Sequence, residues 1–304
     1  MRVLVVSNLY PPVAFGGYEV ECAGVVEHLR LNHDVNVLTS VRGRGQDPSE
    51  RGVARELALL GADERGALQA PFAAPGAVAA ARRALAATPD LVYVWNGASI
   101  PQAALRVLAD SGVPIAFRVC EHWFAGLFTR DQFMRELIPG RRGPGRALWS
   151  RACRAVNALP SLRLSPLAPL RAAICWNAHT LEESVPVPGF VEPVLERVVH
   201  SVPRYGDVYA ALERTPAPTP EIVFLGRVTP YKGLAVAIEA LARVRSGAAP
   251  DASLEVIGPE DPAHGRELRA LARALGVSEA VHWRGLDRHE RERSSQERAR
   301  APMR

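Results

Sequence analysis

The chain has 304 residues, of which 48% are hydrophobic and 23% charged, and this length accommodates two α/β domains with a core each. No apolar run approaches the length of a membrane span, and the first run, Val3–Val6, is too short for a signal peptide, so we expect a cytoplasmic protein. The net charge of +5 admits anionic partners, but no nucleic-acid recognition motif accompanies it. Four scattered cysteines, without a Cys-x-x-Cys pair, argue against a metal site or a disulfide framework.

The first forty residues predict a strand, a helix and a second strand. The strands are expected at 2–7 and 34–39, and the apolar periodicity between them predicts a helix over 18–31. The loop after the first strand holds Gly16 and Gly17 but no Gly-x-Gly-x-x-Gly, so the dinucleotide-binding fingerprint is absent. Two glycines allow the backbone to approach a ligand, and a plain tight turn explains them equally well.

The next segment predicts two helices, around 53–60 and 76–87, and then a strand at 90–95 that ends at Asn96. Ser99 is expected to cap a helix that extends to Asp110.

A further strand at 113–119 places Glu121 and His122 at its C-terminal end. Ligands bind at the carboxyl ends of strands in open α/β sheets, so Asn96 and His122 are candidates for a site. A structural or solvated role for the single histidine is equally plausible.

The region 123–170 combines arginines with apolar side chains: Arg141, Arg142, Arg146, Arg151 and Arg154 with Leu148 and Trp149. A basic amphipathic helix of this kind binds membrane surfaces, but an ordinary arginine-rich surface helix is the interpretation we favour. A strand at 172–176, a short acidic helix at 181–184 and a last strand at 198–202 complete the first domain, and the proline-rich stretch 203–220 predicts a linker.

The second domain begins with the stretch from Glu221 to Gly233. The apolar run from Ile222 to Gly226 predicts a parallel strand buried on both faces, and helical periodicity resumes after Gly233. The loop between them carries Arg227 and Lys232, so backbone N–H groups, a helix N-terminus and two cations surround one anion site, for which phosphate is the obvious ligand.

Lys232 is the single lysine among 37 basic residues. Compositional bias could have left this one lysine on a solvated face by chance. Its position between Pro-Tyr and Gly at the start of a helix nevertheless favours a functional role.

A strand at 253–257, a helix at 264–275 and a strand at 280–283 follow, which is half of a Rossmann-like domain. The strands 222–226 and 281–283 are expected to leave an exposed edge. From residue 287 to 304 there is no Val, Ile, Leu, Phe, Tyr or Trp, so this tail is expected to be disordered or a solvated helix.

Residues 224–233, Phe-Leu-Gly-Arg-Val-Thr-Pro-Tyr-Lys-Gly, resemble the donor-phosphate loop of the retaining nucleotide-sugar glycosyltransferases of family 4. That family has the GT-B fold of two facing Rossmann-like domains, and the resemblance implies that Arg227 and Lys232 hold the diphosphate of the sugar donor. Gly-Gly-Tyr-Glu at 16–19 resembles the family's first loop, which faces donor and acceptor.

The same resemblance extends to single residues. It implies that Gly16 and Gly17 lie near the donor phosphates and that His122 lies beside the transferred sugar. The other candidates that it implies are Tyr18, Glu19, Asn96 and Glu121 on the sugar or acceptor side, and Ile257, Gly258, Trp283 and Arg284 at the nucleobase.

The expected organisation is an N-terminal Rossmann-like domain at 1–202, a linker at 203–220, a partial C-terminal Rossmann-like domain at 221–286 and a charged tail at 287–304. The family's paired-glutamate motif, with seven residues between two glutamates, is missing after Leu286, where Glu290 and Glu297 have six residues between them. We therefore expect a truncated or frame-shifted product with weakened donor contacts.

The leading hypothesis is a retaining glycosyltransferase that uses a nucleotide-diphospho-sugar and a glycan, lipid or small-molecule acceptor, with no further cofactor, no metal and no nucleic acid. The resemblance also implies peripheral contact with the inner face of the membrane. The alternatives are a non-catalytic remnant with weak or no nucleotide binding and, less favoured, another GT-B activity such as nucleotide-sugar epimerisation.

Overall fold

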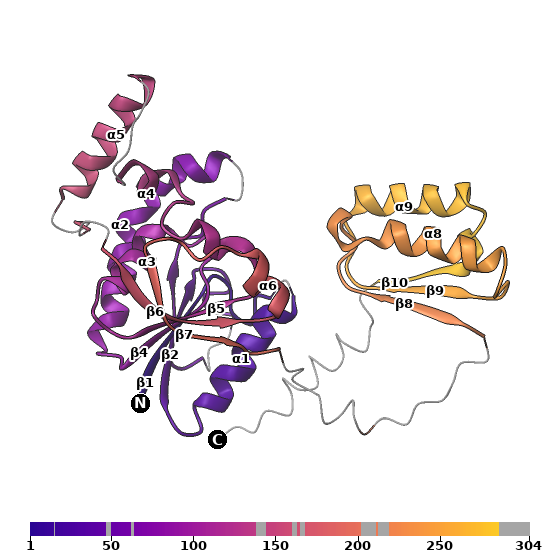
Figure 1. The fold of residues 1–304 in the computed structure, drawn as a ribbon, viewed down its shortest axis with the longest axis horizontal. Coiled ribbons are helices and arrows are strands. Elements are labelled where there is room, and N and C mark those ends of the chain that lie inside the picture. Colours follow the sequence, from indigo (N-terminus) through magenta and orange to yellow (C-terminus); the bar gives the residue numbers. More distant parts are fainter. Residues whose placement is uncertain are drawn as a thin grey trace. The chain divides into compact units, whose positions relative to one another are not determined.

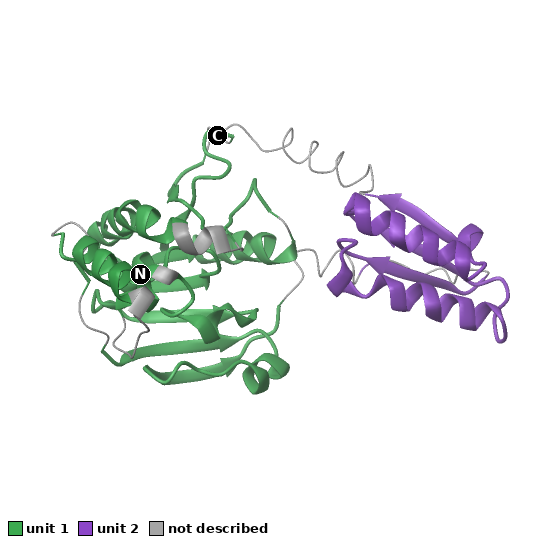
Figure 2. Cartoon of the chain, turned by 90° about the horizontal axis from the view of Figure 1, so that it is seen from above, with its two compact units in different colours: residues 1–210 green, residues 211–304 purple. Residues whose placement is uncertain are grey.

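The computed structural model describes residues 1–14, 16–46, 50–61, 64–137, 144–159, 163–164, 168–201, 211 and 219–285. The chain divides into two compact units, residues 1–210 and 211–304 (Figure 2). The division falls within the predicted linker, most of which, like the predicted tail at 287–304, lies outside the described residues. The proposed domain boundaries therefore stay predictions.

The first unit is built on a seven-stranded sheet in which all strands are parallel (Figure 1). Its order is β3-β2-β1-β4-β5-β6-β7. The strands are β1 (Arg2–Ser7), β2 (Asp34–Ser40), β3 (Val53–Leu57), β4 (Leu91–Asn96), β5 (Ile115–Val119), β6 (Leu170–Trp176) and β7 (Val191–Val198). Because the chain moves outward in both directions from the β1–β4 pair, the loops after these two strands meet at a topological switch point.

The helices of the first unit cover the two faces of this sheet unequally. They are α1 (Gly17–Leu29), α2 (Glu64–Ala86), α3 (Gln102–Ala109), the 3₁₀ helix η1 (His122–Gly126), α4 (Gln132–Leu137), α5 (Pro144–Asn157) and α6 (His179–Ser184). One face packs its alternate side chains, such as Val6 and Val94, against α2 and α3 in the larger core. The other face packs Val5 and Val37 against Cys22 and Val26 of α1.

Three sequence predictions in the first unit are wrong. Residues 53–57 form β3 and not a helix, because the backbone pairs in parallel with β2. The helix expected at 76–87 does form, as the second half of the longer α2. Ser99 does not cap α3: Pro101 holds the N-cap position without a side-chain hydrogen bond. The last strand ends at Val198, where the prediction had it begin.

The arginine-rich stretch forms α5, and Figure 1 shows this helix projecting from the first unit. Leu148, Arg151 and Arg154 are exposed along it, whereas Cys153 is buried. Both interpretations of the stretch remain compatible with this arrangement. No helix in the described ranges combines the length and the apolarity that a membrane crossing requires.

The second unit contains a parallel three-stranded sheet in the order β10-β9-β8. Its elements are β8 (Glu221–Leu225), the 3₁₀ helix η2 (Pro230–Lys232), α8 (Leu234–Arg245), β9 (Ser253–Ile257), α9 (Pro262–Ala274), the 3₁₀ helix η3 (Ser278–Ala280) and β10 (Val281–Gly285). Both long helices lie on one side of the sheet (Figure 1). Leu234, Ile238 and Leu241 pack there against Leu254 and Val256.

The prediction that β8 is buried on both faces is wrong. Ile222 and Phe224 pack toward the helices, but Val223 and Leu225 point to the other face and are 58% and 79% exposed. Within the described sheet, β8 and β10 are both edge strands, as expected for the residues at 222–226 and 281–283. The second sheet therefore presents one open apolar face over β8.

Candidate functional site

The basic loop of the second unit joins β8 to α8 through one turn of 3₁₀ helix. Gly233 ends this turn in the left-handed conformation, with φ of 74°, and α8 begins at the next residue. Glycine adopts this conformation without steric cost, so the chain can turn sharply into the helix. The first N–H groups of α8 have no carbonyl partner within the helix, and only Gly233 separates them from Lys232.

Both cations of this loop lie near one aromatic ring. The guanidinium carbon of Arg227 is 6.0 Å from the ring centroid of Tyr231, and the Nζ of Lys232 is 5.8 Å from it. Arg227, Tyr231 and Lys232 are all exposed, and within the described part of the chain neither cation forms an ion pair with a carboxylate. The loop thus offers two uncompensated positive charges beside a helix N-terminus, an arrangement that favours anions.

The basic loop also packs closely against the end of β9. A Cβ atom added to Gly258, where φ is 143°, would lie 2.0 Å from the carbonyl oxygen of Gly226. The N–H of Val228 donates to the carbonyl of Pro259 at 2.9 Å, which continues the pairing beyond the strands. Ile257 and Gly258, both predicted for the nucleobase, therefore lie next to the basic loop.

The side chains of the other two residues predicted for the nucleobase, Trp283 and Arg284, have separate partners within the second unit. Trp283 packs on the helix-covered face, where the guanidinium of Arg269 in α9 lies 4.1 Å from its ring centroid. Arg284 forms an ion pair with Glu255, with Nε–Oε2 at 2.5 Å and Nη2–Oε1 at 3.1 Å. Trp283 is therefore held against α9 and Arg284 against Glu255, so the two side chains have different partners.

The glycine loop of the first unit is held by the carboxylate of Glu19. Gly16 is the N-cap of α1, and its N–H donates to Glu19 Oε2 at 3.0 Å. The backbone of Gly16 is extended, with φ of −167°, and a Cβ atom added at Gly17 would meet no atom within 4 Å. Glu19, predicted for the sugar or acceptor side, is thus buried, and its carboxylate fixes the backbone of Gly16 to the first turn of α1.

The first turn of α1 is joined to the end of β4. The hydroxyl of Tyr18 donates to the carbonyl of Trp95, and the indole N–H of Trp95 donates to the carbonyl of Tyr18 at 3.2 Å. Burial raises the pKa of Tyr18 well above 10.0, so the phenol keeps its proton and its role as donor. Asn96, also buried, accepts from the N–H of Ala98 at 2.8 Å and orders the turn after β4.

Glu121 and His122 lie exposed after β5, at the start of η1. Because β1, β4 and β5 are parallel neighbours, the loops that carry Gly16, Asn96 and His122 leave the same edge of the sheet. The first unit therefore groups its predicted residues at one carboxyl edge. Among the described residues, no cluster of three or more His, Cys, Asp or Glu side chains could hold a metal ion.

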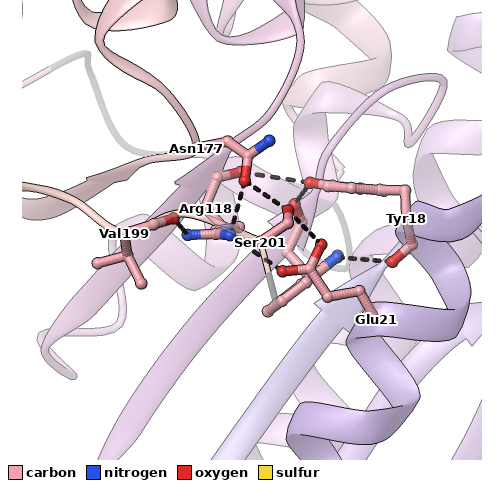
Figure 3. A network of polar contacts seen from close by, with 7 residues as sticks. Tyr18, Glu21, Arg118, Asn177, Val199 and Ser201 are labelled. Atoms are coloured by element: carbon pink, nitrogen blue, oxygen red, sulfur yellow. Dashed lines mark hydrogen bonds and ion pairs between the residues drawn. The ribbon is translucent and has the colours of Figure 1, made fainter. Parts of the chain in front are cut away.

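One cluster at this edge escaped the sequence prediction. Arg118 of β5 is buried and contacts Glu21 of α1, Asn177 after β6 and the carbonyl of Val199 after β7 (Figure 3). The available signal was a charged residue inside the otherwise apolar strand Ile-Ala-Phe-Arg-Val, because charge is almost never fully buried without a partner.

Residues 212–294 match the family model described as glycosyl transferases group 1. No curated protein matches the sequence. Among solved structures, HepE (Alr3699) from Anabaena, in complex with UDP and glucose, is 15% identical with a TM-score of 0.51, and the alignment covers 94% of this chain and 69% of HepE.

Two further solved structures have lower TM-scores. A glycosyltransferase from Rickettsia africae is 12% identical with a TM-score of 0.48, and the alignment covers 94% of this chain and 68% of that one. WaaG, a glycosyltransferase of lipopolysaccharide biosynthesis, is 16% identical with a TM-score of 0.47, at coverages of 93% and 70%.

The matched segment contains residues 219–285 of the second unit, including the basic loop. The fold is similar to that of HepE. The chain thus has the GT-B fold, and the match of residues 212–294 to the glycosyl transferases group 1 model supports a glycosyltransferase.

Proposed function

We propose that the chain transfers a sugar from a nucleotide-diphospho-sugar to an acceptor hydroxyl, with retention of configuration at the anomeric carbon. The observation that carries the proposal is the exposed pair Arg227 and Lys232, which has no carboxylate partner among the described residues and stands ahead of α8 within the group 1 domain. An anion with two negative charges fits two cations and a helix N-terminus.

In this proposal the basic loop stabilises the leaving group. When the bond between the anomeric carbon and the diphosphate breaks, negative charge develops on the departing phosphate oxygen. Arg227 offers a planar fork of donors, Lys232 a compact charge and α8 its free N–H groups, so no metal ion and no further cofactor are needed to carry that charge. The acceptor hydroxyl gives its proton to the departing phosphate oxygen as its own oxygen bonds to the anomeric carbon.

We assign the sugar and acceptor side to the carboxyl edge of the first sheet. His122 and Glu121 are exposed there, and the backbone at Gly16 and Gly17 is open to a ligand. The acceptor belongs to the glycans, lipids or small alcohols, and a cytoplasmic location, at the inner membrane face for a lipid acceptor, is part of the same proposal. Ile257 and Gly258 are the assigned neighbours of the nucleobase.

Isothermal titration with UDP, UDP-glucose and the corresponding GDP and ADP compounds tests the donor assignment. UDP and glucose are the first choice because HepE was solved with both. Lys232→Ala and Arg227→Ala should each weaken binding by about tenfold or more, since each removes a charge-assisted contact to phosphate. Arg243→Ala, which removes an exposed cation from the last turn of the same helix, should leave the affinity unchanged.

A second candidate is a nucleotide-binding protein without turnover. The open apolar face at Val223 and Leu225 favours it, because parallel sheets are normally covered on both faces. Release of UDP from UDP-glucose in the presence of an acceptor mixture separates the two functions. Binding without release supports the second candidate, and no binding of any nucleotide contradicts both.

A further inference from the structure

Arg118 stands at the carboxyl end of β5 and is only 2% exposed. Its Nη2 donates to Glu21 Oε1 at 3.0 Å and to Asn177 Oδ1 at 2.8 Å, and its Nη1 donates to the carbonyl of Val199. Ser201 closes the cluster, since its hydroxyl is 2.7 Å from both Glu21 Oε2 and Asn177 Oδ1. One guanidinium thus joins α1, the loop after β6 and the segment after β7 (Figure 3).

Stability alone does not account for an ion pair in which the guanidinium of Arg118 is buried and the carboxylate of Glu21 is only 14% exposed. Removing a guanidinium and a carboxylate from water costs several kcal/mol per ion, and well-packed apolar residues of similar volume are often as stable or more stable. A buried ion pair does, however, fix the relative positions of the groups that it joins, because any displacement leaves a charge without its partner.

The groups that Arg118 joins are next to the glycine loop. Glu21 lies one helical turn after Gly17, and the guanidinium of Arg118 is 5.4 Å from the ring centroid of Trp95. Trp95 in turn exchanges two hydrogen bonds with Tyr18, the residue that follows Gly17. The direction in which α1 and its glycine loop leave the sheet is therefore set through Arg118 and Trp95.

We propose that Arg118 is a positioning residue for sugar transfer: its contacts with Glu21, Asn177 and Val199 hold the glycine loop at the carboxyl edge of the first sheet. This inference rests on the proposed function and assigns Arg118 no direct contact with the donor or the acceptor. Misplacing a ligand-facing group by about 1 Å can lower turnover by up to about a hundredfold, so loss of Arg118 should affect kcat strongly.

The test compares Arg118→Met with Arg106→Met. Arg106 of α3 is a matched control, because it is also 2% exposed, pairs with a carboxylate (Asp110, at 2.7 Å) and lies 5.5 Å from an aromatic centroid (Phe128). It belongs to a helix on the opposite face of the sheet. Both variants are assayed well below their melting temperatures for kcat and for KM of the donor, and hydrogen exchange is measured at residues 16–18 and 199–201.

Arg118→Met should lower kcat by about tenfold to a hundredfold with KM for the donor within about threefold, and should accelerate exchange at both segments. Arg106→Met should change neither, and Arg118→Lys should restore part of kcat because its ammonium reaches Glu21 but not all three partners. Equal losses in the two Met variants, or unchanged exchange at the glycine loop in Arg118→Met, overturn the inference.

If Arg118→Met does not fold, Glu21→Gln provides the same comparison, since it keeps the shape and removes the charge. A wild-type chain that neither binds nor turns over a nucleotide-sugar contradicts the proposed function. The exchange comparison then still decides whether Arg118 positions the glycine loop.

Discussion

The glycine loop of the first unit and the basic loop of the second unit use charged side chains in opposite ways. In the first unit, Arg118 is buried beside the glycine loop and pairs with Glu21, whose side chain is 14% exposed, so the two charges neutralise each other. In the second unit, Arg227 and Lys232 are exposed and face only the ring of Tyr231 within the described residues. Charge that is paired inside the chain fixes structure, whereas exposed charge without a partner remains available for a ligand.

The same contrast holds for the two sheets. In the first unit the strands bury side chains on both faces around β1, against α2 and α3 on one side and α1 on the other. Among the described residues of the second unit, the face toward α8 and α9 is covered, whereas Val223 and Leu225 on the other face are exposed. An equivalent apolar substitution should therefore lower the free energy of unfolding by very different amounts in the two sheets.

The largest expected effect is a selective loss of the second unit in Gly258→Ala. The added Cβ would clash with the Gly226 carbonyl, and alanine is strained at a φ of 143°, so the unit should lose about 3 kcal/mol or more of unfolding free energy. Hydrogen exchange should rise at residues 219–285 and stay unchanged in the first sheet.

Gly276→Ala is the control for Gly258→Ala. This glycine also has a positive φ, of 68°, but its added Cβ meets no atom, so the cost should be only about 1 kcal/mol. Equal costs at the two positions would show that the close approach of Gly226 and Gly258 does not hold the loop.

A Val→Ala substitution should distinguish the two sheets. Val6→Ala shortens a fully buried side chain of β1 and should lower the free energy of unfolding by about 2 kcal/mol. Val223→Ala, at a 58% exposed position of β8, should cost less than about 0.5 kcal/mol. Urea unfolding measures both, and a large loss in Val223→Ala would mean that this face of β8 is covered in solution.

Donor affinity should depend on salt through the basic loop. Raising the ionic strength from about 0.05 M to about 0.5 M should weaken UDP binding on the order of threefold to tenfold, because exposed charges are screened. Lys232→Ala should show a smaller salt dependence than the wild type in the same titration. A binding constant independent of salt would argue against a site on these exposed cations.

The smallest effect concerns alkaline pH. Burial raises the pKa of the Cys120 thiol from 9.0 to about 11, so the folded chain keeps this proton longer than the unfolded chain. The resulting stability is complete below pH 9 and is lost as the pH rises through 11. Urea unfolding across this interval should show a smaller loss in Cys120→Ser, and an identical loss would assign the change to other groups.

Much of the architecture was predictable from local pattern. The run Arg2–Ser7 is apolar from Val3 to Val6, helical periodicity begins after Gly233, and the strand at 253–257 ends at Gly258. Residues 53–57 lie in the helix predicted at 53–60, and they form a strand because their backbone pairs with β2. Tertiary pairing of this kind leaves no trace in a short window.

The candidate site was predictable where it rests on sequence neighbours. Arg227 and Lys232 share one loop, so their proximity to each other and to α8 followed from the motif. Glu21, Arg118 and Asn177 come from three elements far apart in the chain, and their contact depends on the strand order. The exposed face of β8 was also missed, because an apolar run does not state whether both of its sides are covered.

The exposure of Lys232 has a practical consequence, since the sequence contains no second lysine. Apart from the N-terminal amine, an amine-directed reagent has one primary target on this chain, and it lies in the loop assigned to the diphosphate. A fluorophore or crosslinker attached there would report occupancy of that loop without any engineered residue, and a bound nucleotide should protect the amine from modification.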